Sequence, residues 1–122
     1  MAETKDKLLI VEDDPGLQSQ LKWSFEDFDV AAAEDRNGAL AQLRRLEPPV
    51  VTLDLGLPPD PGGVTEGFGL LEEMLALAPD TKVVVVTGHN DRTNAMRAIA
   101  MGAYDFYEKP IDADLLAITI RR

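Results

Sequence analysis

The chain repeats one arrangement, in which a short run of consecutive apolar residues ends in an acidic or hydroxyl side chain. Three such runs occupy residues 8–11, 50–53 and 83–86. Because they are apolar at consecutive rather than alternating positions, they are typical of strands buried on both faces, as in a parallel sheet covered by helices. Segments of helical period separate the runs, and this alternation predicts βαβ units and a mainly parallel sheet.

Helical periodicity fills the stretches between the runs, and two weaker strand segments complete the pattern. Helices are expected from Asp14-Pro15 onward, from about Arg36 until Pro48-Pro49, over 68–78, from about Asp91 to Met101 with Gly102 as the stop, and from near Asp112. The weaker strands are expected at 28–33 and 103–108. Five strands and five helices therefore alternate, which predicts the α/β class with a doubly wound five-stranded parallel sheet.

The composition excludes several classes of protein. The 122 residues suit one domain, and 12 Lys and Arg against 22 Asp and Glu give a net charge of −10. An acidic surface repels phosphate backbones, so direct binding to nucleic acid is not expected. There is no cysteine, and no apolar run is long enough for a membrane span or a secretory signal. A cytoplasmic protein is the expectation.

The side chains that end the strands predict the chemistry of one site. Parallel strands bring their carboxyl ends to the same edge of a sheet, where ligands bind. Glu12, Asp13 and Asp54 would meet there, and three carboxylates at close range repel one another unless a cation such as Mg²⁺ or Mn²⁺ neutralises them. Thr87 and Lys109 would add a hydroxyl and an ammonium for two oxygens of a phosphoryl group. Phosphoryl transfer to an aspartate is therefore the predicted reaction.

Glu12-Asp13, Asp54, Thr87 and Lys109-Pro110, in this order and at these separations, resemble the receiver domains of bacterial two-component response regulators. Taken singly, Asp54 could be a turn residue and Lys109-Pro110 an exposed turn, but four coincidences at strand ends favour the functional interpretation. The resemblance covers the chain from Leu8 to the last helix. It implies a flavodoxin-like (βα)5 fold with strand order 2-1-3-4-5, and a signalling function in place of an enzyme's, since a receiver catalyses only its own phosphorylation and dephosphorylation.

The resemblance assigns a role to each acidic residue of the predicted site. It implies that Asp54 is the phosphoacceptor, that Asp13 is a direct metal ligand, and that Glu12 is the acidic neighbour of the metal. It also implies that the backbone carbonyl of Gly56 binds the same Mg²⁺ or Mn²⁺ ion.

The remaining residues of the motif are implied to sense the phosphoryl group. Thr87 corresponds to the switch hydroxyl and Lys109 to the lysine that pairs with the phosphoryl group, often through a cis bond to Pro110. Phe106 corresponds to the aromatic residue that turns inward when Thr87 moves. The fourth helix, the fifth strand and the fifth helix would then present a changed surface to a partner.

Segments 94–99 and 101–106 are similar to regulators of the sigma-54 type, which carry an ATPase module and a DNA-binding tail. Residues 1–122 are accordingly expected to form the receiver domain at the N-terminal part of a longer transcriptional regulator. The expected partners are a sensor histidine kinase, the output modules of the same chain, and a second receiver in a phosphorylation-dependent homodimer. No contact with nucleic acid or membrane is expected of this domain.

Segment 56–67 departs from the family pattern. It holds three prolines and four glycines, so an irregular loop is expected there. The glycine that opens the third helix in the family best matches Gly67, which implies a loop about five residues longer than usual. His89, two residues after Thr87, is placed where it could approach the site and tune dephosphorylation.

Three other functions fit the sequence less well. Phosphatases of the haloacid dehalogenase class also use an aspartate at a strand end, but they need a second aspartate two residues later, where this chain has Gly56. A nucleotide-binding module would need a glycine-rich loop after the first strand, where Glu12-Asp13-Asp14-Pro15 stands instead. A domain that mediates interactions without phosphorylation is disfavoured because every acid and the lysine are present.

Overall fold

The computed structural model describes residues 5–60, 62–88 and 92–121. Its five strands are β1 (Lys7–Val11), β2 (Asp29–Ala33), β3 (Val50–Leu53), β4 (Lys82–Thr87) and β5 (Asp105–Glu108). They form one parallel sheet in the order β2-β1-β3-β4-β5. This confirms the predicted class and strand order.

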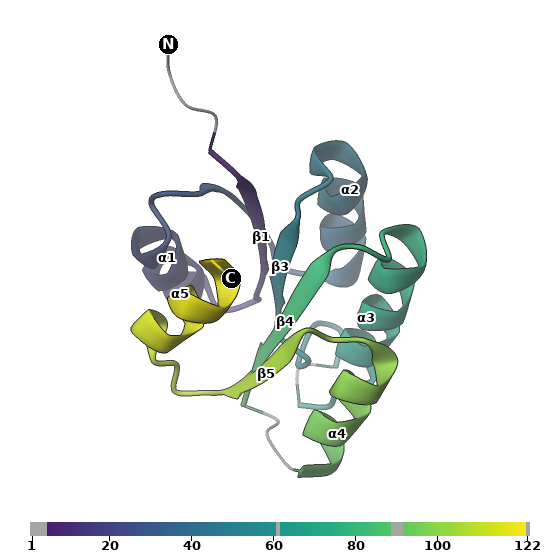
Figure 1. Ribbon diagram of the computed structural model, residues 1–122. Coiled ribbons are helices and arrows are strands. Elements are labelled where there is room, and N and C mark those ends of the chain that lie inside the picture. The colour runs from purple at the N-terminus through teal and green to yellow at the C-terminus, as the bar shows by residue number, and fades with distance from the viewer. Residues whose placement is uncertain (1–4, 61, 89–91, 122) are drawn as a thin grey trace.

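Helices cover both faces of the sheet (Figure 1). They are α1 (Pro15–Ser24), α2 (Arg36–Leu46), α3 (Thr65–Leu77), α4 (Arg92–Met101) and α5 (Ala113–Arg121). One hydrophobic core lies between the sheet and α1 with α5, and the other between the sheet and α2, α3 and α4. The consecutive apolar residues of β1, β3 and β4 divide between these two cores, which explains why their sequences do not alternate.

Asp14, Asp112 and Gly102 mark helix ends as the sequence predicted, and Asp35 marks a further helix start. Asp14 and Asp35 are the N-caps of α1 and α2, and their carboxylates accept hydrogen bonds from backbone N–H groups of the first turns. Asp112 Oδ1 accepts from two backbone N–H groups at the start of α5. Gly102 has φ 111°, the left-handed conformation expected of the glycine that follows a helix.

Two predicted boundaries were wrong. α3 begins at Thr65 instead of at residue 68, so Gly67 lies within its first turn and not before it. Gly67 is buried against the backbone of Leu55. This is a tertiary contact, and the periodicity of apolar residues does not predict it. β5 begins at Asp105 instead of 103, because residues 103 and 104 still belong to the turn that follows α4. The N–H of Tyr104 donates to the carbonyl of Val83 directly before the strand begins. The predicted start of α4 at Asp91 lies outside the described residues.

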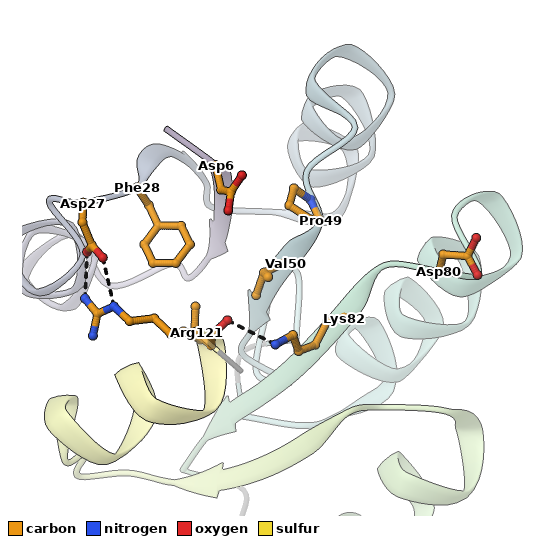
Figure 2. A pocket seen from close by; sticks show the side chains of 9 residues that line it. Asp6, Asp27, Phe28, Pro49, Val50, Asp80, Lys82 and Arg121 are labelled. Atoms are coloured by element: carbon orange, nitrogen blue, oxygen red, sulfur yellow. Dashed lines mark hydrogen bonds and ion pairs between the residues drawn. The ribbon is translucent and has the colours of Figure 1, made fainter. Parts of the chain in front are cut away.

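The sheet's amino edge anchors the end of α5 (Figure 2). Arg121 makes a forked ion pair with Asp27, with Nε–Oδ2 at 2.9 Å and Nη2–Oδ1 at 2.7 Å. Lys82 Nζ donates to the carbonyl oxygens of Thr119 and Ile120 at 3.2 and 3.1 Å. These contacts hold α5 at the edge opposite to the strand ends that carry the acidic residues.

None of the helices in the described part of the chain combines the length and the apolar character needed to cross a membrane.

The close approach of α3 to Leu55 yields a prediction about stability. A Cβ at Gly67 would overlap the backbone of Leu55, whereas a Cβ at Gly69 would meet only the flexible end of Arg36. Gly67→Ala should lower the free energy of unfolding by about 1–3 kcal/mol through overpacking. Gly69→Ala, in the same helix, should stay within about 1 kcal/mol of the parent, because alanine also improves helix propensity. Urea unfolding measures both, and equal stability of the two variants would contradict the prediction.

Candidate functional site

The four predicted strand ends meet at the carboxyl edge of the sheet. Ladder-type hydrogen bonds continue past three of them: the N–H of Glu12 donates to Ala33 O at 2.9 Å and the N–H of Asp54 donates to Val11 O at 3.0 Å. The N–H of Lys109 donates to the carbonyl of Thr87 at 3.0 Å. The backbone at the site is therefore fixed by the sheet and not by free loops.

Three carboxylates form the centre of this site. Glu12, Asp13 and Asp54 each place a carboxylate oxygen so that all three lie within 4.8 Å of one another. Glu12 is 2% exposed and Asp54 6%, and Asp13 is half-buried. The structure thus brings together the three acidic side chains that the sequence predicted, in an environment where their charges are poorly hydrated.

Lys109 supplies the positive charge nearest to the cluster. Its Nζ lies 2.7 Å from Glu12 Oε1 and 3.1 Å from Asp54 Oδ2, so one ammonium bridges the acids that follow β1 and β3. Its bond to Pro110 is cis, as the resemblance suggested. One ammonium between two nearly buried carboxylates leaves the cluster with an excess of negative charge.

The pKa values at the site reflect burial and the neighbouring charges together. Burial raises the pKa of Glu12 from 4.5 to about 7, opposed by the hydrogen bond from Lys109 and reinforced by the charge of Asp54. For Lys109, burial acts to lower the pKa, but the hydrogen bond to Glu12 and the charge of Asp54 outweigh it, so its pKa is raised. The ammonium therefore stays charged, while Glu12 holds a proton far more readily than an ordinary glutamate.

Backbone N–H groups orient the two buried acids. The N–H of Gly56 donates to Asp54 Oδ1 at 3.2 Å, and the N–H of Asp14 donates to Glu12 Oε2 at 3.1 Å. The side-chain amide of Gln18 also donates to the carbonyl of Glu12. Gln18 is not among the predicted residues of the site, and its only signal in the sequence is a position one turn into the helix that follows the acids.

The predicted switch residues lie on β4 and β5, on the side of the sheet away from β2. Thr87 ends β4 and is completely buried. Phe106 lies on β5 opposite Val85 and packs, half-buried, against the core beneath α3 and α4. His89 lies outside the described residues.

The donor set suits a divalent cation such as Mg²⁺. Such an ion prefers oxygen ligands, and the cluster offers carboxylates from two strand ends, with the backbone of Gly56 beside Asp54. An added cation would offset the repulsion among the three carboxylates. The residues present therefore fit the ion that the sequence analysis expected.

Comparison with known proteins identifies the family. Residues 8–121 match the model of the response regulator receiver domain. The chain is 35% identical over 117 residues to the nitrogen assimilation regulatory protein NtrX of Azorhizobium caulinodans and to the C4-dicarboxylate transport transcriptional regulatory protein DctD of Rhizobium meliloti. Each match covers 94% of this chain and 25% or 24% of the relative, so the chain spans about a quarter of their length.

Solved structures agree with this assignment. The receiver domain of NtrX from Brucella abortus has a TM-score of 0.84 at 33% identity, covering 94% of this chain and 95% of that one. A CheY-like receiver domain protein from Methanospirillum hungatei has a TM-score of 0.87 at 28% identity, covering 97% and 92%.

The chain belongs to the response regulator receiver domain family. Its function is signal transduction in a phosphorelay, and the family is not in itself a family of enzymes.

Charge repulsion in the cluster predicts an unusual effect of one substitution. Without divalent cations, Asp13→Asn should raise the free energy of unfolding by about 1–2 kcal/mol, because it removes a like charge from a partly hydrated site. Asp14→Asn removes the same charge outside the cluster and preserves a good N-cap, so it should change stability little.

Thermal unfolding with and without Mg²⁺ measures this difference. The parent should gain stability from Mg²⁺ by binding linkage, and Asp13→Asn should gain much less. If Asp13→Asn destabilises the metal-free protein, repulsion within the cluster is not the dominant charge effect at this position.

Proposed function

We propose that the chain accepts a phosphoryl group from a sensor histidine kinase on Asp54, in a reaction that requires Mg²⁺ or Mn²⁺. The observation that carries this proposal is the surroundings of the Asp54 carboxylate. Lys109 lies 3.1 Å from Oδ2, and the carboxylates of Glu12 and Asp13 complete a cluster within 4.8 Å. Asp54 follows β3, the middle strand of the sheet, and it shares Lys109 with Glu12.

Each residue of the site has a distinct part in the proposed reaction. A carboxylate oxygen of Asp54 attacks phosphorus, and the donor's imidazole, or acetate when acetyl phosphate is the donor, leaves with the electrons of the broken bond. Glu12, Asp13, Asp54 and the Gly56 carbonyl would hold the cation, which supplies positive charge for the phosphoryl oxygens. Lys109 pairs with one phosphoryl oxygen, and the hydroxyl of Thr87 donates a hydrogen bond to another. Positioning and charge stabilisation of this kind suffice for phosphoryl transfer.

The proposed output is a change of surface at α4, β5 and α5. Movement of Thr87 toward the phosphoryl group would open space for Phe106 to turn inward, since the two residues lie on neighbouring strands. The surface to be changed carries exposed apolar side chains that suit protein contacts, namely Met96, Ile99, Tyr104, Leu115 and Ile118. A phosphorylation-dependent homodimer through these residues is part of the proposal.

The comparisons support a wider role in transcription. The relatives named above are regulatory proteins about four times as long as this chain, and DctD is described as a transcriptional regulator. We infer that residues 1–122 serve as the receiver domain at the N-terminal part of such a regulator, with ATPase and DNA-binding modules as output. The domain itself catalyses no reaction beyond its own phosphorylation and dephosphorylation.

Intact-mass analysis after incubation with acetyl phosphate and Mg²⁺ tests the phosphoacceptor. The parent should gain one phosphoryl group that is stable in acid and labile in base, and Asp54→Asn should gain none. Asp14→Asn, which removes an exposed charge near the site, should still be phosphorylated. A folded, metal-binding parent that gains no mass would indicate a receiver that binds its partners without phosphorylation.

The switch is tested by Thr87→Ala. This variant should still be phosphorylated on Asp54, because the hydroxyl is not the attacking group. Phosphorylation should shift the amide resonances of residues 105–109 in the parent but leave them nearly unchanged in the variant. Equal shifts in both proteins would show that Thr87 does not transmit the signal.

A further inference from the structure

The connection from Asp54 to α3 is anchored differently at its two ends. Near β3, Leu57 is completely buried in the core beneath α2, α3 and α4. At the other end, the N-cap position of α3 is Val64, whose side chain makes no hydrogen bond to the helix. The carboxylates of Asp14 and Asp35 do make such bonds in α1 and α2. The first turn of α3 therefore depends on tertiary contacts for its position.

Arg36, the first residue of α2, provides a polar contact of this kind. Its Nε donates to Glu73 Oε1 at 2.8 Å, and its Nη1 lies 3.6 Å from Glu66 Oε1. The guanidinium lies against Gly69, where a Cβ would come within 2.7 Å of Nη1. Glu66, Gly69 and Glu73 lie on one face of α3, so Arg36 contacts this helix over two turns. Asp35 caps α2 directly before Arg36, and this cap fixes the backbone from which the Arg36 side chain extends.

Backbone contacts connect the part of α3 that Arg36 holds to the proposed phosphoacceptor, Asp54. Glu66 precedes Gly67, which packs so closely on Leu55 that a Cβ would overlap the backbone there. Leu55 lies between Asp54 and Gly56, and the N–H of Gly56 donates to Asp54 Oδ1 at 3.2 Å. A shift of the first turn of α3 would therefore move the backbone that orients the Asp54 carboxylate.

We propose that Arg36 is a positioning residue for the cation site. By holding the first turn of α3 against Leu55, it keeps Gly56 where its backbone can serve the cation bound beside Asp54. This inference rests on the function proposed above. An open cleft of about 480 Å³ lies between the start of α2 and Pro58-Pro59, so close packing does not hold the loop against α2 there.

Arg36→Gln tests the proposal, with Arg121→Gln as its matched control. Arg121 forms a similar forked ion pair with Asp27, but at the opposite edge of the sheet (Figure 2). Arg36→Gln should weaken Mg²⁺ binding roughly threefold to tenfold, less than the loss typical of residues that contact a metal ligand directly. It should also shift the Gly56 amide resonance in the metal-free protein. Arg121→Gln should change neither quantity.

Two further measurements separate positioning from a general loss of stability. Phosphorylation of Arg36→Gln by acetyl phosphate should be slow at low Mg²⁺ and should recover at saturating Mg²⁺. Arg36→Lys keeps the charge but cannot reach both carboxylates as a fork, so its Mg²⁺ affinity should be intermediate. This variant also keeps the test valid if Arg36→Gln folds poorly.

The outcomes distinguish this proposal from the one on which it rests. Parental Mg²⁺ affinity and a parental Gly56 resonance in folded Arg36→Gln would overturn the role of Arg36. A parent that binds Mg²⁺ but takes no phosphoryl group would instead overturn the proposed function, while the Mg²⁺ titration and the Gly56 resonance would still decide the role of Arg36.

Discussion

The ammonium of Lys109 between the carboxylates of Glu12 and Asp54 is the interaction on which the site depends. Two acids that are 2% and 6% exposed would be costly without a nearby positive charge, and the sheet fixes them too firmly to move apart. Burial raises the pKa of Glu12 to about 7, and the charge of Asp54 adds to this effect while the hydrogen bond from Lys109 opposes it. The fold thus holds three carboxylates close together, a donor set that suits a divalent cation.

The two cores give the sheet different neighbours on its two faces. On one face α5 is held at the amino edge by Arg121 and Lys82, far from the acids. On the other face Phe106 is only half-buried against the core beneath α3 and α4. In the proposed switch, a change at the carboxyl edge would alter β5 and α4 while the far end of α5 stays anchored. This arrangement suits a domain that converts a local charge change into a change of surface.

Much of this could be predicted because a parallel sheet imposes simple rules. Consecutive apolar runs identify buried strands, and strands that run parallel must end at one edge, so Glu12, Asp54, Thr87 and Lys109 had to meet. The start of α3 could not be predicted in this way. Segment 56–67 is rich in glycine and proline, yet its last three residues are helical. Gly67 there packs against the backbone of Leu55, a contact that periodicity does not encode.

The sequence by itself determined the elements, their class and the residues of the acid cluster, because local periodicity and the chemistry of strand ends are properties of short segments. The tertiary structure decided which contacts orient those residues. The bond from Gln18 to the Glu12 carbonyl and the contacts of Arg36 with Glu66 and Glu73 depend on how helices pack on the sheet. Such contacts join different elements of the fold, and packing sets their distances.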